Sequence, residues 1–202
     1  MTPEARSQLR VFAALELPPA LCAQLSEVVA GLEALLPRGG VRWAKVGGMH
    51  VTLKFYGEVA SERLAELQAA LKQAAESAGP IALELQGLGV FPNPVHPRVI
   101  WVNVAGEVEK LLPLYQKVEQ ASAALGFKPE ARGFTPHLTL GRVKGHLGPR
   151  EREALADALA RQRGQAFGAF SAETLSLMRS ELKPTGAEYA RLFAASLSGR
   201  MG

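Results

Sequence analysis

Aspartate, a residue that many hydrolases depend on, is almost missing from this sequence. The only one among 202 residues is Asp157, which lies in a helical pattern with no histidine beside it. Hydrolases that use paired divalent metals hold them with clustered aspartate, glutamate and histidine ligands. The sequence shows no such cluster, so a mechanism without a metal is favoured.

Cysteine and long apolar runs are equally scarce. The single cysteine, Cys22, cannot form an internal disulfide, which favours a reducing cytosol. No apolar run approaches the length of a membrane span, and residues 1–10 are too polar for a signal peptide. We therefore expect a cytoplasmic protein without membrane contact.

The charged residues are mixed in sign. There are 23 lysines and arginines against 19 acidic residues, which leaves a net charge of +4. This balance permits an anionic partner, but an ordinary solvated surface has the same composition. The length is enough to bury a core in one domain, so we expect residues 1–202 to form a single domain and a monomer.

The most informative feature is a short motif that occurs twice. His50-Val51-Thr52-Leu53 and His137-Leu138-Thr139-Leu140 use two of the four histidines in the chain. Side chains alternate faces along an extended strand, so each motif presents its histidine and threonine on one face. The intervening apolar residues then point into a core on the other face.

These residue types suit phosphodiester hydrolysis. The reaction needs a base to take a proton from water and an acid to protonate the departing oxygen. It also needs hydrogen-bond donors for the phosphate oxygens, where charge is held in the transition state. Two imidazoles that titrate near neutral pH and two threonine hydroxyls supply these groups, and a bell-shaped rate profile near neutral pH would follow. Strand repetition in a duplicated fold, without chemistry, is the alternative.

The periodicity predicts an α+β fold. Short apolar or alternating runs indicate strands, and apolar residues at three-to-four spacing indicate helices. The two motifs lie 87 positions apart, with strand and helix patterns around each, which indicates an internal duplication. We expect two pseudo-symmetric lobes around a central cleft, each an antiparallel sheet backed by helices. The predicted strands are 9–17, 41–43, 50–59, 81–90, 99–104, 137–143, 170–179 and 189–197, and the predicted helices are about 21–35, 64–78, 111–125 and 149–163.

The twin motifs and their surroundings resemble a known family. The motifs look like the paired signatures of the two-histidine phosphoesterase superfamily. The wider frame is similar to the bacterial and archaeal RNA 2',3'-cyclic phosphodiesterases (the ThpR or LigT type, formerly called 2'-5' RNA ligases). The stretches that carry this resemblance are 10–14, 42–43, 54–59, 91–92, 97–101, 126–127, 135–137, 141–143 and 179–182.

The resemblance implies an activity and site residues. It implies metal-free opening of a terminal 2',3'-cyclic phosphate on RNA to a 2'-phosphomonoester, with no cofactor. His50 would be the general acid and His137 the general base, although the pseudo-symmetry of the site allows the opposite assignment. Thr52 and Thr139 would hold the phosphate. The RNA could be a tRNA fragment, another oligonucleotide or a small nucleoside cyclic phosphate.

Arg142 is a further phosphate contact that the resemblance implies. Strict alternation from His137 places position 142 on the opposite face, because the offset is odd. A β-bulge at Gly141 would remove this conflict. Phe55 holds the equivalent place after His50 and has the same parity conflict. It is a candidate to pack against the nucleobase, and core filling is the alternative.

Several residues beside the motifs are candidate RNA contacts. Arg42 and Lys54 could follow an RNA backbone by charge, and Trp43 could stack on a base. A solvated basic face, and core packing of the tryptophan, are the alternatives. The other basic candidates are Lys45, Arg98, Arg132 and Lys144.

Two other functions use the same residues. One is an RNA-end binding module that does not turn over. The other is the reverse chemistry, in which the site forms a 2'-5' linkage between RNA ends. Turnover in the presence of a chelator distinguishes the hydrolase from the binding module.

Overall fold

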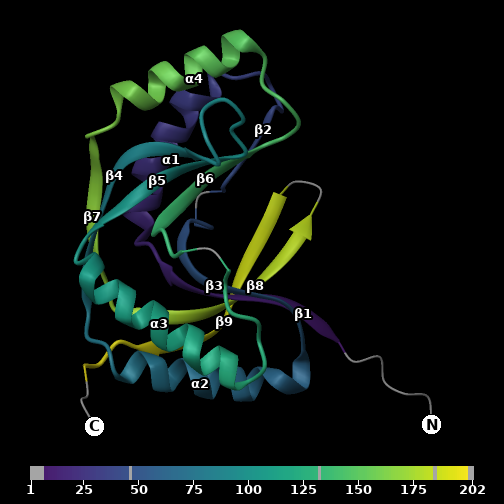
Figure 1. Ribbon diagram of the computed structural model, residues 1–202, viewed down its shortest axis with the longest axis vertical. Helices are drawn as coiled ribbons and strands as arrows, with labels where there is room; N and C mark the ends of the chain where they lie inside the picture. The colour runs from purple at the N-terminus through teal and green to yellow at the C-terminus, as the bar shows by residue number, and fades with distance from the viewer. Residues whose placement is uncertain (1–6, 46, 132, 184–185, 200–202) are drawn as a thin grey trace, which may run out of the picture.

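The computed structural model describes residues 7–45, 47–131, 133–183 and 186–199. These segments contain strands and helices in a mixed order, as the sequence periodicity predicts (Figure 1). The strands are β1 (Gln8–Glu16), β2 (Val41–Trp43), β3 (His50–Ala60), β4 (Ile81–Phe91), β5 (Val99–Gly106), β6 (His137–Val143), β7 (Ala166–Ala172), β8 (Thr174–Lys183) and β9 (Gly186–Ser196). The helices are α1 (Pro19–Glu33), α2 (Leu64–Glu76), α3 (Val108–Ala124) and α4 (Pro149–Arg161), with a 3-10 turn at Ser61–Arg63.

The strands form one continuous antiparallel sheet with two halves. Its order is β7-β4-β5-β6-β3-β1-β8-β9, and β2 pairs with β6 beside this path. The halves meet where Val51 of β3 pairs with Leu138 of β6. Each motif strand is thus the innermost strand of its half, and the predicted two-lobed α+β architecture is confirmed.

Each half of the sheet is covered by helices from both halves of the chain. Helices α2 and α3 lie side by side across β3, β8 and β9, at the bottom of Figure 1. Helices α1 and α4 lie at the other end of the molecule, where α1 contacts β7 and α4 contacts β4. The helix that follows β1 therefore covers the half of the sheet that contains β6, and the helix that follows β5 covers the half that contains β3.

Alternation along the motif strands separates core from site. Val51, Leu53, Leu138 and Leu140 are at most 4% exposed and belong to the main core beneath the helices. Their neighbours His50, Thr52, His137 and Thr139 are half-buried on the opposite face. We call this opposite side of the sheet the histidine face.

The strand prediction for residues 170–179 is wrong, because two strands meet there. Strand β7 ends at Ala172 and pairs with β4 in one half, whereas β8 begins at Thr174 and pairs with β1 in the other. Glu173 therefore lies where the chain crosses between the halves. Two consecutive apolar strands give no periodicity signal at such a crossing.

The predicted start of the helix at about residue 111 is also wrong. Helix α3 begins at Val108, which places Pro113 in its second turn instead of its first. Proline lacks the N–H that would bond the carbonyl of Glu109 one turn earlier. Both residues are exposed, so water can reach that carbonyl and the interruption is tolerated.

Candidate active site

The two histidines are held in the same way. The Nδ1 atom of His50 lies 2.8 Å from the carbonyl oxygen of Gly48, and Nδ1 of His137 lies 2.8 Å from the carbonyl oxygen of Thr135. A carbonyl can only accept a hydrogen bond, so Nδ1 carries the proton in both rings. Each neutral imidazole is therefore left with a basic Nε2 for chemistry.

The pairing of Val51 with Leu138 brings the two motifs together. Continuing this antiparallel register by one residue in either direction sets His50 across from Thr139 and His137 across from Thr52. All four side chains lie on the histidine face. The pair of strands thus supplies two imidazoles and two hydroxyls around a local pseudo-two-fold axis.

The same irregularity follows both motifs. Along β1, Ala14 pairs with Thr52 and Ala13 with Lys54, so Leu53 is an extra residue in β3. Along β5, Trp101 pairs with Thr139 and Ile100 with Gly141, so Leu140 is the corresponding extra residue in β6. A bulge of one residue reverses the alternation beyond it.

The bulges bring Arg142 and Phe55 to the histidine face. Both side chains are exposed, and the residues before them are buried. The expectation that a bulge would remove the parity conflict is confirmed, with the extra residue at position 140, immediately before Gly141. A Cβ on Gly141 would lie 2.6 Å from Trp43 Cε3 and 2.7 Å from Val41 Cγ1, so the close approach of β2 requires glycine.

The positive charge of Arg142 affects the pKa of one histidine in each half of the sheet. Burial is the main cause that lowers the pKa of His50 to about 4, and the charge of Arg142 contributes to the shift. Burial also lowers the pKa of His137, again with a contribution from Arg142. The hydrogen bonds to the two carbonyls oppose these shifts. Both imidazoles are therefore neutral at pH 7 in the free protein.

Arg42 adds a second positive charge beside Arg142. The two residues are directly paired across β2 and β6, so their side chains share the histidine face. Like charges directly opposite each other are destabilising, and the structure shows no carboxylate paired with either among the described residues. An anion between the strands would relieve this repulsion.

Aromatic rings that the sequence interpretation did not select surround both histidines. Phe12 lies 4.6 Å and Tyr189 4.9 Å from the ring centre of His50. In the other half, Phe91 lies 5.0 Å from His137. Phe12 and Phe91 were noted only as parts of matching stretches. Nothing in the local sequence marks Tyr189, because it reaches the site through pairing of β8 with β9.

Among the residues that the structure describes, a carboxylate pairs with His50 and none pairs with His137. Glu16 of β1 pairs with His50, and its charge opposes the lowering of the His50 pKa. The carboxylate accepts a 2.6 Å hydrogen bond from Ser176 Oγ and contacts Arg191 Nε at 2.8 Å. At the equivalent position in β5, Asn103 pairs with His137. This difference breaks the pseudo-symmetry of the site.

The four candidate RNA contacts differ in exposure: two are exposed, one is half-buried and one is buried. Phe55 is 54% exposed and lies 5.6 Å from the ring of Phe12, which suits a stacking surface. Arg42 is exposed on the histidine face beside Arg142. Trp43 is half-buried against Gly141, so it packs mainly against the protein.

The expectation for Lys54 is wrong. Lys54 immediately precedes the exposed Phe55 and points to the helix-covered side, where only 4% of it is exposed. Its Nζ lies 2.7 Å from Glu119 Oε1 of α3 and 3.0 Å from the carbonyl oxygen of Lys128. The same bulge that exposes Phe55 therefore turns Lys54 away from any ligand. The basic candidate Arg132 lies outside the described residues.

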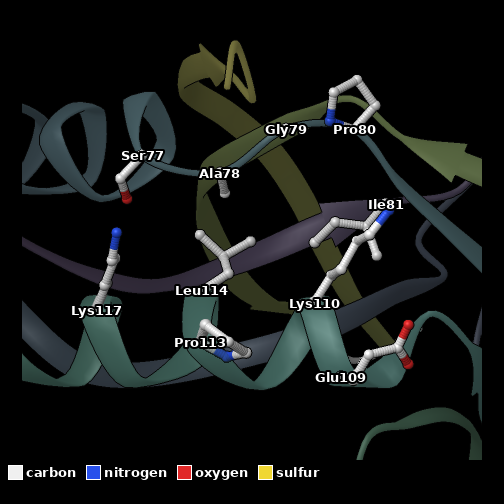
Figure 2. Close-up of a pocket in the computed structure, with 10 residues that line it drawn as sticks. All are labelled: Ser77, Ala78, Gly79, Pro80, Ile81, Glu109, Lys110, Pro113, Leu114 and Lys117. Carbon is white, nitrogen blue, oxygen red and sulfur yellow. The ribbon is translucent and has the colours of Figure 1, made fainter. Parts of the chain in front are cut away.

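A groove away from the two histidines is lined by other kinds of side chain (Figure 2). It encloses about 340 Å³ between the connection of α2 to β4 and the first turns of α3. Its walls are mostly apolar, and the polar residues that line it are Ser77, Glu109, Lys110 and Lys117. No residue of either motif lines it. We assign it no part in the chemistry of the histidines.

The described residues form neither a metal-binding cluster nor a membrane-spanning helix. No group of three or more histidine, cysteine, aspartate and glutamate side chains lies close enough to hold a metal ion in these segments. Within the same residues, no helix is both long and apolar enough to cross a membrane.

A bilobal sheet in which two His-x-Thr strands meet is the arrangement of a two-histidine phosphoesterase. The model of the LigT-like phosphoesterases matches the chain twice, over residues 15–101 and 102–189. These matches begin 87 positions apart, as do His50 and His137, which supports the predicted duplication. The chain belongs to the LigT-like phosphoesterase family.

Individual relatives agree with this assignment. The RNA 2',3'-cyclic phosphodiesterase of Methanothermobacter thermautotrophicus is 32% identical over 182 residues, which are 90% of this chain and 95% of the relative. The crystal structure of TT0787 of Thermus thermophilus superposes with a TM-score of 0.77 at 29% identity, over 96% and 100% of the two chains. E. coli LigT complexed with 3'-AMP shares the fold, with a TM-score of 0.73 at 22% identity over 95% and 99% of the chains.

Proposed function

We propose that the protein hydrolyses RNA 2',3'-cyclic phosphate ends to 2'-phosphomonoesters, without a metal, as a cytoplasmic monomer. The relatives named RNA 2',3'-cyclic phosphodiesterase support the substrate class. One observation supports the mechanism. In both histidines Nδ1 donates a hydrogen bond to a carbonyl oxygen, which leaves Nε2 available for proton transfer, and the charge of Arg142 lowers the pKa of both rings.

In this mechanism the two imidazoles move one proton each. His137 Nε2 takes a proton from water while the water oxygen attacks phosphorus. The bond from phosphorus to the 3' oxygen breaks, and protonated His50 Nε2 gives its proton to that oxygen. The product carries a 2'-phosphate and a 3'-hydroxyl. His137 then releases its proton to solvent and His50 takes one up, which resets the pair.

The remaining polar groups stabilise the phosphate. Thr52 and Thr139 can donate their hydroxyl hydrogens to the non-bridging oxygens from the two strands. Arg142, with Arg42 beside it, offers the fixed positive charge that favours the phosphorane-like transition state. The phosphate anion in turn raises the pKa of a nearby imidazole, which lets His50 hold a proton once substrate is bound.

Glu16 supports the assignment of His50 as the acid. Its carboxylate favours the protonated form of the imidazole paired with it, whereas His137 has only the neutral Asn103 in that place. Burial nevertheless lowers the pKa of His50 to about 4, so its role as the acid requires that the bound phosphate restore the proton.

Substitution of each histidine tests the proposal. His50→Ala and His137→Ala should each reduce kcat for adenosine 2',3'-cyclic phosphate by at least about 100-fold, with circular dichroism and melting temperature near those of the parent. Turnover of the parent protein should be unchanged in EDTA. Binding of the RNA end without turnover would overturn the proposal in favour of a binding module, and sensitivity to EDTA would overturn the metal-free mechanism.

A second substrate distinguishes the histidine that acts as general acid from the one that acts as general base. A phosphodiester with a nitrophenolate leaving group needs no proton on its departing oxygen. His50→Ala should therefore retain far more activity on this ester than on the cyclic phosphate, whereas His137→Ala should lose both. The opposite pattern would exchange the two roles.

A further inference from the structure

Basic side chains gather at one end of the half of the sheet that contains β6. This end is formed by the loop at 91–98, the loop at 143–148 and the start of α4. Three segments that supply or adjoin them contain no acidic residue at all: residues 34–57, 85–106 and 131–150. All 19 acidic residues lie elsewhere in the chain. The segments form β2, β5, both histidine motifs and the loops at this end. We call the four exposed or half-buried cations beyond the phosphate site the edge track: Arg98, Lys144, Arg150 and Arg152.

The edge track is continuous with the phosphate site. Lys144 follows Arg142 by two residues, with the buried Val143 between them, so both project to the same side about 7 Å apart. Arg98 Nη1 donates a 2.8 Å hydrogen bond to the carbonyl oxygen of Gly145, which places its guanidinium beside Lys144.

The track continues to the start of α4. Arg152 Nη1 donates a 3.2 Å hydrogen bond to the carbonyl oxygen of Val95, in the loop between β4 and β5. Arg150 lies in the same first turn of α4 and is exposed. The loop at 91–98, the loop at 143–148 and α4 therefore hold these cations next to one another.

No carboxylate neutralises the charges of the edge track among the described residues, whereas several other surface cations are paired. In the half that contains β3, four exposed or half-buried basic side chains pair with carboxylates: Arg63 with Glu66, Arg179 with Glu181, Lys183 with Glu188 and Arg191 with Glu16. Arg10 and Lys117 in this half are exposed and form no such pair among the described residues. Lys45 also pairs with Glu188. None of the four track residues forms such a pair among the described residues, although Glu151 and Glu153 lie in the same helix turn.

We propose that the edge track binds the RNA strand that leads up to the cyclic phosphate, so the preferred substrate is an oligonucleotide chain and not a mononucleotide. This inference rests on the proposed function, since the reacting end must sit at the histidines. A row of unpaired cations leading away from a phosphate site complements a row of backbone phosphates. Phe91 beside His137 offers an aromatic ring where the strand would enter.

The test compares two substrates with the same reacting group. The double variant Lys144→Gln/Arg150→Gln removes two exposed track charges that hold no carboxylate within the described part of the chain. For an RNA of about ten nucleotides with a 2',3'-cyclic end, we expect KM to rise about tenfold at low salt. The slope of log KM against log salt should fall by about 1.4, which is about 0.7 for each lost phosphate contact on a single strand. The kcat/KM for adenosine 2',3'-cyclic phosphate should not change.

A matched control removes the same charge elsewhere. Lys72→Gln/Lys117→Gln alters exposed lysines on α2 and α3, at the other end of the molecule. This variant should hydrolyse both substrates as the parent does. An equal rise of KM in both double variants, or an equal effect of the track variant on the mononucleotide, would overturn the inference.

Failure of the proposed function gives a different result. In that case the parent protein would leave both substrates intact. Fluorescence anisotropy with the labelled oligonucleotide would then still compare the track variant with its control. Equal affinities of the parent and the track variant would overturn the track independently of turnover.

Discussion

Val51 and Leu138 face each other at the centre of the molecule, and each has 0% of its surface exposed. This one pair joins the two halves into a continuous sheet, and the residues on either side of it are the histidines and threonines of the site. The packing of two apolar side chains on the buried face therefore sets the separation of polar side chains on the other face. We therefore expect changes at this position to affect both stability and catalysis.

Leu138→Ala should lower both stability and activity. The cavity should cost roughly 2–5 kcal/mol of unfolding free energy, because the side chain is fully buried. Relaxation of β6 into the cavity should also lower kcat per folded molecule. Leu155→Ala in α4, where the side chain is 2% exposed, is the control and should lose stability alone. Chemical denaturation and steady-state kinetics give the two quantities, and equal kcat for the two variants would contradict the coupling.

The dependence of kcat/KM on pH should be bell-shaped with its optimum on the acid side of pH 6.5. The free protein needs one imidazole protonated and one neutral, and burial lowers the pKa of His50 to about 4 and also that of His137. Because Arg142 contributes to both shifts, Arg142→Gln should raise both values and move the optimum to higher pH. Arg161→Gln, in α4, should leave the optimum in place. An optimum near pH 7 that Arg142→Gln does not move would contradict this account.

Lys54→Met should destabilise the protein without weakening substrate binding. Its ammonium and Glu119 form a pair whose side chains are 3% and 13% exposed, so removal of one partner strands a buried charge and should cost roughly 3–5 kcal/mol. Lys72→Met breaks an exposed pair with Glu76 and should cost less than about 1 kcal/mol. Thermal melts measure both changes. A higher KM for Lys54→Met at unchanged stability would return Lys54 to the ligand surface.

Gly141→Ala should displace β2 and weaken phosphate binding. The added methyl group would overlap Trp43 and Val41, and β2 carries Arg42. We expect a lower melting temperature and a higher inhibition constant for inorganic phosphate. Gly31→Ala is the control, since this helical glycine has open space around it and alanine there should stabilise by up to about 1 kcal/mol. Normal phosphate inhibition of Gly141→Ala would show that β2 does not support the site.

The two lobes should unfold as one unit. Helices are exchanged between the halves and the sheet is continuous, so neither half has a complete core alone. Calorimetry should show a single transition whose calorimetric and van't Hoff enthalpies agree. Two resolved transitions would contradict the expectation of one domain over residues 1–202.

Local periodicity was sufficient to predict most elements and the facing of the motif residues. An alternating strand fixes which neighbours share a face, so His50 with Thr52, and His137 with Thr139, could be placed without coordinates. The repeat of the motif at 87 positions indicated the duplication. The bulge near Gly141 could be inferred only with the family resemblance, which implies Arg142 as a phosphate contact and so requires it to change face.

Other features depend on contacts between distant segments. Lys54 turns into the protein because α3 offers Glu119, 65 positions later in the chain. Tyr189 reaches His50 because the last strands pair with the first. The break at Glu173 exists because β7 and β8 join different halves of the sheet. Side-chain alternation is a local property of the backbone, so the sequence carries it. Partners across a sheet are selected by how the whole core packs, and only the folded chain decides them.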